Sequence, residues 1–493
     1  MGTAALLLIA LAAIAVLLVL VIKFEFSAYV SLLLVAMGTA LVAGVPVAQV
    51  VPTMIEGMGK VLGSVAIIVG LGSMLGRMIE VSGGADALAN RFTAALGPRW
   101  VIAAVTAAAF ILGIPIFFDV GFIILAPIVF AFAKSSGLHP LKFGLPVGGV
   151  LLAVHVALPP HPGPVAAAAQ IGADVGLLTL IGLVICAIVG VFGYLIAGRF
   201  KVDRIELADS PALAGMHAAD EAEATSGTAS SAISASPPAS SPISASAPAS
   251  SPNPASASAD VDGGVATARR TASAGLVMFL ILLPIAMIMA GSVTATVMDE
   301  GNPLRDLAGF IGQPTTALLV AVVVAYLTLG PRMGWDKTRR TQILDSALPM
   351  VAVIIFVTGA GGVFGNVLVK TGIGTALSES LHDMGLPLIL AGYVICLALR
   401  AAQGSATVAI LTAGGLIQPA IAAGGYSSLQ VVVLTLATCF GGLGLSHIND
   451  SGFWIVTKWQ GLSVADGLRT WTVLTTAMSL IGFALCWLLW LVI

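Results

Sequence analysis

Charged residues are scarce in this chain: 9% of its 493 residues are Asp, Glu, Lys or Arg, whereas 58% are hydrophobic and the mean hydropathy is +1.06. This composition excludes an ordinary soluble domain and is typical of membrane proteins that cross the bilayer many times. The net charge is −2 and no dense basic patch is present, so nothing in the sequence indicates nucleic-acid binding.

Cysteine is also rare. The four cysteines stand singly in apolar stretches and lack the spacing of a metal site, so we expect them to pack in the core and expect neither a metal nor a cofactor. They are Cys186, Cys396, Cys439 and Cys486.

Long uncharged runs recur along the chain, and each is long enough for a helix that crosses the bilayer. The first run has no basic residue before it and Lys23 after it, which predicts an uncleaved helix whose amino terminus lies outside the cytoplasm. The third crossing is expected at about residues 60–79. The runs are 4–22, 27–55, 175–198, 271–298, 307–331, 346–369 and 470–493.

Residues 203–268 are rich in Ser, Ala and Pro and contain the near-copies SAISASPPAS and SPISASAPAS. Such a segment buries too little apolar surface to offset its conformational entropy, which predicts a disordered linker between residues 1–202 and 269–493. Basic residues flank it on both sides, so we place the linker in the cytoplasm.

The two flanking segments are similar at one constant offset, which sets Gly76 opposite Gly365 and Gly83 opposite Gly372. Each is predicted to hold about five transmembrane helices plus one re-entrant hairpin, at about 100–133 and 386–423, and one broken span, at about 143–172 and 428–454. An odd number of crossings turns the second segment over. The predicted fold is therefore all-α with an inverted-topology repeat and both termini in the periplasm.

The four interruptions carry the chemistry. Within the predicted hairpins and broken spans the only formal charges are Asp119, Arg400 and Asp450, and each lies at or beside a break. Broken helices expose backbone N–H groups, which suit an anion, and carbonyls, which suit a cation or a hydroxyl. The breaks therefore predict a polar binding site inside the membrane.

Each charge has two interpretations. Arg400 is suited to a substrate carboxylate, or it neutralises Asp119 or Asp450 in a buried structural pair. Asp119 and Asp450 either cap helix starts or exchange a coupled proton.

Uncharged polar residues and glycines at the same breaks are candidates for substrate binding, although hydroxyls and amides can instead bond the backbone and histidines can be ordinary core residues. His155 precedes its break, so we expect it in the core. The candidates besides Arg400 are His161, Gly163, Gln403, Gly404, Ser405, Thr407, His447, Asn449 and Ser451.

The motifs at the breaks resemble those of the gluconate permease family of bacterial inner-membrane symporters. They are FFDVGF from Phe117, LPPHPGP from Leu158, AQGSATVA from Ala402 and HINDSGFW from His447. The resemblance implies proton-coupled uptake of gluconate or a related small hydroxy acid, in the fold of the ion transporter superfamily. Members of that superfamily are thought to work as elevators and often form dimers, so the resemblance also implies a homodimer. The long linker departs from the family pattern.

The sequence thus predicts a secondary active transporter for a small organic anion. Two alternatives from the same fold stay open: a sodium-coupled carboxylate carrier, and a carrier of D-serine or another small polar acid. An intramembrane enzyme could be drawn with Ser405 and His447, but neither GxSxG nor HExxH is present, so we expect no enzyme.

Overall fold

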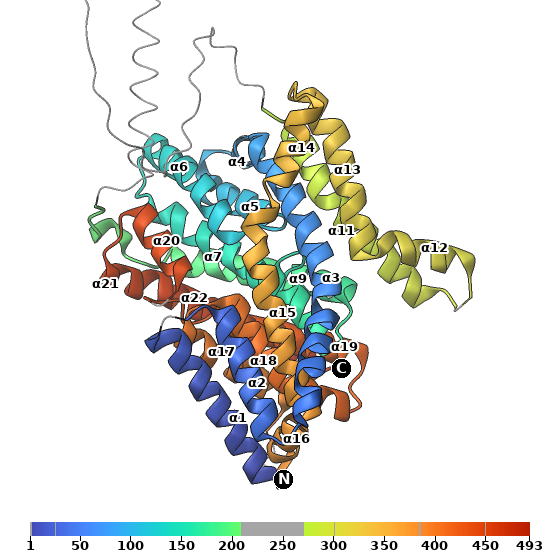
Figure 1. Cartoon of the computed structure of the whole chain (residues 1–493). Coiled ribbons are helices and arrows are strands. Elements are labelled where there is room, and N and C mark those ends of the chain that lie inside the picture. The colour runs from blue at the N-terminus through green and yellow to red at the C-terminus, as the bar shows by residue number, and fades with distance from the viewer. Residues whose placement is uncertain (1, 25, 209–270, 300, 384–385, 449) are drawn as a thin grey trace, which may run out of the picture.

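The computed structural model describes residues 2–24, 26–208, 271–299, 301–383, 386–448 and 450–493. Regular structure in these ranges is helical throughout (Figure 1). Nine of the described helices are long and apolar enough to cross a membrane. This agrees with the predicted all-α membrane fold.

The segment before residue 209 forms nine α-helices, with a short turn between α5 and α6. The helices are α1 (Thr3–Leu18), α2 (Ala28–Val42), α3 (Val47–Val81), α4 (Gly84–Leu96), α5 (Val101–Gly113), α6 (Phe118–Ser136), α7 (Leu141–Ala157), α8 (Pro162–Ile171) and α9 (Val175–Ala197).

The segment after residue 270 begins with four helices that lead into the long α15: α11 (Ala274–Val297), α12 (Pro303–Gly312), α13 (Pro314–Arg332), α14 (Lys337–Asp345) and α15 (Leu348–Lys370). It continues with α16 (Ile373–Asp383), α17 (Leu388–Gln403), α18 (Ala406–Ala423), α19 (Ser428–Gly441), α20 (Ser451–Gln460), α21 (Val464–Gly467) and α22 (Val473–Trp490).

All four predicted interruptions separate helices. Two lie between the arms α5–α6 and α17–α18, and two divide the spans α7–α8 and α19–α20. Gly404 turns between α17 and α18 with φ +79°, which glycine adopts without steric cost. The constant offset sets α8 opposite α20 residue for residue, so the order of elements repeats. The opposite orientation of the two repeats stays a prediction.

One predicted boundary is wrong. α3 starts at Val47 and includes the residues before position 60, whereas the sequence placed a crossing at about 60–79. Glu56 and Lys60 lie one helical turn apart and form an ion pair at 2.6 Å, and Lys370 approaches the same carboxylate at 3.4 Å. Because these charges compensate one another, they do not end the helix.

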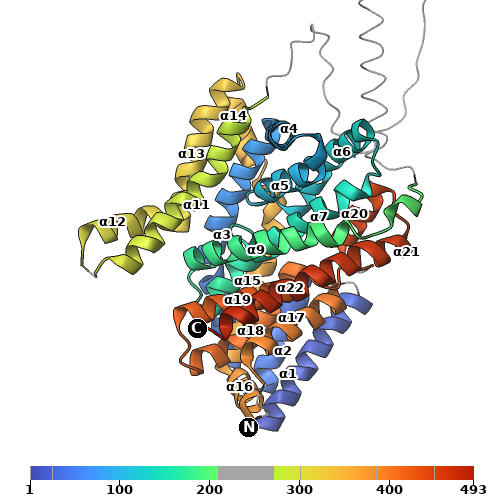
Figure 2. The same ribbon diagram turned by 180° about the vertical axis from the view of Figure 1, so that it is seen from behind.

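α3 and α15 lie side by side in both ribbon views and join the segment before residue 209 to the segment after residue 270 (Figures 1 and 2). They approach closely because their contact is built from glycine: a Cβ on Gly57 would lie 2.7 Å from the Gly362 carbonyl oxygen. Glycines on α3 also allow close contact with two interruptions, the one between α5 and α6 and the one between α7 and α8. A Cβ on Gly76 would lie 2.1 Å from the Pro115 carbonyl oxygen, and one on Gly72 would lie 2.5 Å from Pro160.

The described residues just before position 209 lie against loops of the helical body. Lys142 pairs with Asp203 at 2.9 Å, His139 Nε2 donates to the Ile205 carbonyl at 3.1 Å, and the Ala208 amide donates to the Gly461 carbonyl at 2.9 Å. The hydrogen bond from Lys142 lowers the pKa of the exposed Asp203 carboxyl below its ordinary value. Most of the predicted linker, residues 209–268, lies outside the described residues.

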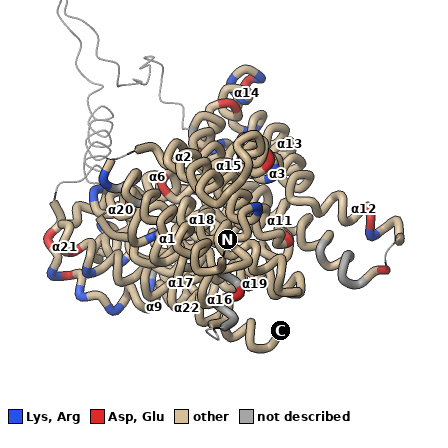
Figure 3. The backbone as a smooth tube through the Cα atoms, turned by 60° about the horizontal axis from the view of Figure 1, so that its bottom comes forward, with Lys and Arg blue, Asp and Glu red and all other residues tan. Residues whose placement is uncertain are grey.

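Charge is concentrated away from the centre of the bundle. Lys, Arg, Asp and Glu gather around α14, α12 and α21, and fewer of them lie among the helices in the middle of the view (Figure 3). The charges that lie within the bundle therefore need a specific explanation.

The approach of Gly76 to the break of the first repeat gives a test. We expect Gly76→Ala to lower the thermal unfolding midpoint in detergent, because overpacking of this kind costs about 1–3 kcal/mol. Gly70→Ala on the same helix is the matched control, since the nearest atom to its Cβ would be Leu348 Cδ2 at 3.9 Å. Equal midpoints for the two variants would contradict the close contact.

Candidate functional site

A cavity of about 390 Å³ lies where three of the four breaks meet. Its walls come from α6 and α7 of the first repeat and from α17, α18 and α20 of the second, with α2 and α15 completing the lining. The residues that line it are Ala28, Phe117, Phe118, Asp119, Val120, Leu152, His155, Val353, Val357, Arg400, Ser405, Ala406, Thr407, Val408, Asp450, Ser451 and Gly452.

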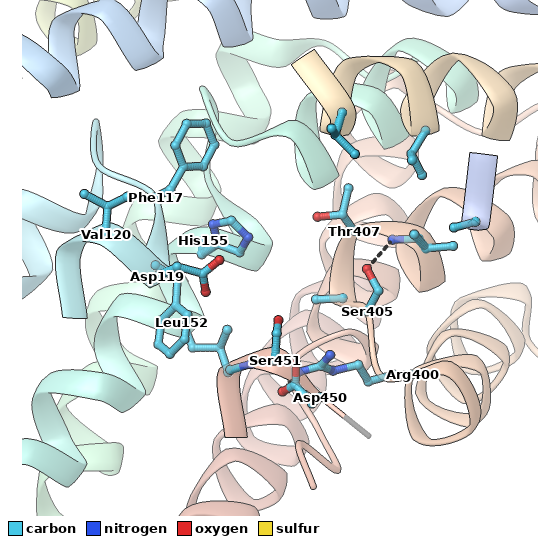
Figure 4. Close-up of a pocket in the computed structure, with 17 residues that line it drawn as sticks. Phe117, Asp119, Val120, Leu152, His155, Arg400, Ser405, Thr407, Asp450 and Ser451 are labelled. Carbon is cyan, nitrogen blue, oxygen red and sulfur yellow. Dashed lines mark hydrogen bonds and ion pairs between the residues drawn. The ribbon is translucent and has the colours of Figure 1, made fainter. Parts of the chain in front are cut away.

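Figure 4 shows how the polar side chains are arranged. Asp119 and His155 lie on one side of the cavity and Ser405 and Thr407 on the opposite side, with Ser451 near the base beside Arg400 and Asp450. Six of the predicted site residues are thus brought together: Asp119, Arg400, Ser405, Thr407, Asp450 and Ser451.

Three helices begin at the cavity. α6 starts at Phe118, α18 is capped by Ser405, whose Oγ accepts from the Val408 amide at 3.4 Å, and α20 is capped by Asp450, whose Oδ1 accepts from the Gly452 amide at 3.0 Å. The start of a helix carries partial positive charge and free N–H groups. Three such starts around one cavity favour an anionic ligand.

Arg400 and Asp450 form an ion pair across two breaks. The Arg400 side chain is 1% exposed, and it donates Nη2 to Asp450 Oδ2 and Nη1 to the Gly404 carbonyl. Ser446 Oγ donates to the same Asp450 oxygen and accepts from Trp471 Nε1 at 2.8 Å. The pair therefore fixes the tip of α17–α18 to the start of α20. This is the structural role that the sequence left open for both residues.

Two buried donors at this tip have no hydrogen-bond partner among the described residues, namely Arg400 Nε and Gln403 Nε2. Pairing with Asp450 therefore does not use all the hydrogen-bond donors of Arg400. Arg400 also lines the cavity.

Asp119 differs from Asp450. It lies in the first turn of α6 with its side chain open to the cavity, and within the described ranges it makes neither a hydrogen bond nor an ion pair. With Arg400 neutralised by Asp450, an ionised Asp119 is the uncompensated charge of the lining.

Five of the predicted residues lie near the cavity but not in its lining. His161 is buried and its Nε2 donates to the Gly113 carbonyl at 2.7 Å, and His447 Nε2 donates to the Ala401 carbonyl at 2.9 Å. Gly163 faces α18, where an added Cβ would lie 3.8 Å from Thr407 Cα. Gln403 and Gly404 form the turn between α17 and α18. Asn449 lies outside the described residues.

Sequence reasoning missed part of the lining. His155 lines the cavity although it precedes its break, and Val353 and Val357 enter from α15, far from any interruption. For His155 the sequence did hold a signal, namely a polar side chain in an apolar helix three residues before Leu158. Nothing in the local sequence marks the two valines, because only tertiary packing brings α15 to the cavity.

Apolar spans around a buried polar cavity define the class of integral membrane transport proteins. The comparisons give the family. A model described as GntP family permease matches residues 5–239 and 242–492, and the chain belongs to that family. It is therefore a multi-pass membrane transporter of the gluconate permease family and not an enzyme, which confirms the resemblance of its motifs.

Curated relatives match over the full length. The chain is 52% identical to the inner membrane permease YgbN of Escherichia coli K12, over 100% of both chains. It is 33% identical to the low-affinity gluconate transporter of the same organism, over 98% of this chain and 97% of that protein. It is 30% identical to the Gnt-II system L-idonate transporter of that organism, over 97% of each.

A solved structure supports the fold alone. The crystal structure of the YdaH transporter of Alcanivorax borkumensis matches with a TM-score of 0.57 and 11% identity, over 93% of this chain and 96% of that chain.

The ion pair gives a double-mutant test. Arg400→Gln and Asp450→Asn should each lower stability by about 3–5 kcal/mol, because each strands one buried charge. The double variant should recover a large part of that loss, since no charge remains unpaired. Thermal unfolding in detergent measures all four proteins, and losses that simply add would show that the pair does not couple the two breaks.

Proposed function

We propose that this permease takes up gluconate or a related small hydroxy-acid anion together with a proton, by alternating access. The observation that carries the proposal is Asp119, a carboxylate without an ion-pair partner among the described residues, in a cavity at which three helices begin. The names of the gluconate and L-idonate transporters among the relatives support this class of substrate.

Electrostatics links the anion to a proton. A substrate carboxylate that enters beside ionised Asp119 meets a like charge in a partly desolvated space, which is unfavourable. Protonation of Asp119 removes that repulsion, so one proton and one monoanion bind together and move as a neutral load. Asp450 is less suited to this exchange, because its oxygens accept from Arg400, Ser446 and the Gly452 amide and its protonation would strand Arg400.

Several carbonyls freed by the breaks already accept hydrogen bonds from side chains. The Gly404 carbonyl bonds Arg400, the Ala401 carbonyl bonds His447, the Gly113 carbonyl bonds His161, and the Ile448 carbonyl accepts from Trp454 Nε1 at 2.7 Å. These four oxygens are then not free for a cation cage, which supports proton coupling over the sodium-coupled alternative.

We assign substrate contacts from this arrangement. The open side chains of Ser405, Thr407 and Ser451 would bond substrate hydroxyls, and the helix starts and the unpaired Arg400 Nε would attract the carboxylate. Gln403, His447, His161 and the glycines Gly163 and Gly404 would support the tips, and Asn449 keeps its predicted contact role. D-Serine, the other small polar acid we considered, presents fewer hydroxyls to these groups.

The proposed topology follows the repeat. Residues 1–202 and 269–493 form the two membrane units in opposite orientation, with the linker 203–268 in the cytoplasm and both termini in the periplasm of a bacterial inner membrane. The repeated order of hairpin and broken span and the basic residues beside the linker support it.

An elevator motion and a homodimer complete the proposal. The cavity lies between the broken elements and the helices α2 and α15, which is where a mobile unit would meet a scaffold. α12 leaves the bundle in Figures 1 and 2, and Leu304, Leu307 and Phe310 on it are 62%, 55% and 65% exposed. A second copy would cover this apolar face.

Uptake into proteoliposomes tests the coupling. With an acidic exterior we expect gluconate to accumulate about tenfold per pH unit, the ratio for electroneutral symport of one proton with one gluconate anion. Accumulation should not require sodium. Asp119→Asn should keep substrate exchange but lose accumulation, because the cavity is neutral without a proton. Asp174→Asn is the control, since Asp174 caps α9 at an exposed site and Asn caps as well as Asp. Absence of accumulation of gluconate, glycerate and D-serine by the parent protein would reject the proposal.

Spin labels test the motion and the dimer together. Labels on Val323→Cys in α13 and Val394→Cys in α17 attach at sites 47% and 50% exposed, while the four native cysteines are buried. We expect two distance populations whose ratio changes with substrate. One fixed distance argues against the elevator.

A single label on Phe310→Cys tests the dimer and should report a distance only if two copies associate. Absence of a measurable distance argues against this dimer contact.

A further inference from the structure

We propose that His155 recognises a substrate hydroxyl: its Nε2 accepts the hydroxyl hydrogen, and His161 holds it in the tautomer that can do so. The inference deepens the proposed function and rests on a hydroxylated acid as substrate. It concerns a residue that the sequence had assigned to the core.

The tautomer follows from two hydrogen bonds. His161 Nε2 lies 2.7 Å from the Gly113 carbonyl oxygen, and a carbonyl oxygen only accepts, so this nitrogen carries a hydrogen. In a neutral imidazole the other nitrogen, Nδ1, then has a lone pair. His155 Nδ1 lies 3.2 Å from that atom and must donate to it. The hydrogen of neutral His155 is therefore on Nδ1, and its Nε2 is an acceptor.

Burial keeps His161 neutral in this relay. Its side chain is 2% exposed, and no carboxylate in the described part of the chain forms an ion pair with it. Phe117 packs against both imidazoles, with ring centroids 5.7 Å from His161 and 6.1 Å from His155. Phe118 lies 6.5 Å from the His155 ring. These contacts restrict rotation of the two imidazole rings.

His155 faces the polar side chains of the cavity in Figure 4. The ionisable groups that face it are Asp119 on α6, Arg400 on α17, Asp450 at the start of α20, and His161. Arg400 and Asp450 neutralise each other, and in the proposed cycle Asp119 is protonated when substrate is bound. Bound substrate thus meets a protonated carboxyl, which donates, beside an imidazole, which accepts. A hydroxyl can satisfy both at once.

The relay also joins two breaks. Gly113 ends α5, His161 precedes α8, and His155 lies on α7, so the acceptor in the cavity is positioned by the tip of one element and the interruption of another. His161 acts through His155 and is a positioning residue. This role explains why His161, a predicted site residue, is absent from the cavity lining.

Binding of gluconate and of gluconates that each lack one hydroxyl tests this assignment in the purified full-length protein. In the parent, one of these deoxy acids should bind about tenfold more weakly than gluconate, the loss typical of one hydrogen bond. His155→Phe should bind that acid and gluconate equally, because the acceptor is gone, and His155→Gln should restore the preference through its amide oxygen. His161→Phe should reduce the preference with smaller effects on total binding. His139→Gln, in a loop outside the cavity, is the matched control and should behave like the parent.

Nitrogen-15 NMR of the histidine rings gives a second readout that does not depend on binding. We expect Nδ1–H for His155 and Nε2–H for His161 in the parent, and a redistribution of the His155 hydrogen in His161→Phe. An Nε2–H tautomer for His155, or an unchanged hydroxyl preference in His155→Phe, would overturn the inference. A parent protein that binds no hydroxy acid would instead reject the proposed function, and the NMR result would still test the relay.

Discussion

The structure depends on satisfying backbone groups where helices break inside a membrane protein. Four interruptions expose carbonyls that lipid cannot hydrogen-bond, so side chains of the protein must bond them, either from the same interruption or from a neighbouring one. In the first repeat His161 bonds the carbonyl that ends α5, and in the second His447 bonds a carbonyl at the end of α17. On each side of the undescribed residues 209–270, a histidine thus fastens the end of one helix to a neighbouring interruption. The cavity is the space that these fastened tips leave between them.

The segments before residue 209 and after residue 270 use a similar order of helices for different chemistry. The second adds Arg400 and Asp450, whose charges cancel and whose hydrogen bonds hold the tip rigid. The first contributes Asp119, which no cation in the described residues neutralises by an ion pair, and the two coupled imidazoles. A charge that is fully paired gains little by titrating, whereas an unpaired one changes the net charge of the cavity when it binds a proton. The fixed pair therefore gives the cavity its shape, and the unpaired carboxylate gives it a variable charge.

How far the sequence predicted this arrangement depended on how local the signal was. Gly404 and the pair Pro159–Pro160 weaken a helix locally, so the breaks were visible in sequence, and the polar residues inside them located six residues of the cavity lining. The start of α3 was mispredicted because Glu56 and Lys60 are unusually polar for a transmembrane helix. Glu56 pairs with Lys60 and with Lys370, and the second pair forms only when α3 packs against α15. The position of His155 relative to His161 was equally hidden, since it depends on how α7 packs beside the end of α5.

The apolar walls explain why so few polar groups suffice. Phe118, Leu152 and Val357 cover part of the cavity with buried apolar side chains, which lowers the local dielectric and strengthens the hydrogen bonds and charges beside them. In such a space an unsatisfied acceptor is costly, which makes a substrate that lacks the matching hydroxyl a poor ligand. The same desolvation makes an unprotonated Asp119 costly beside an anion. Selectivity for a hydroxy acid and coupling to a proton thus have one physical origin, namely polar groups that only the correct load can satisfy together.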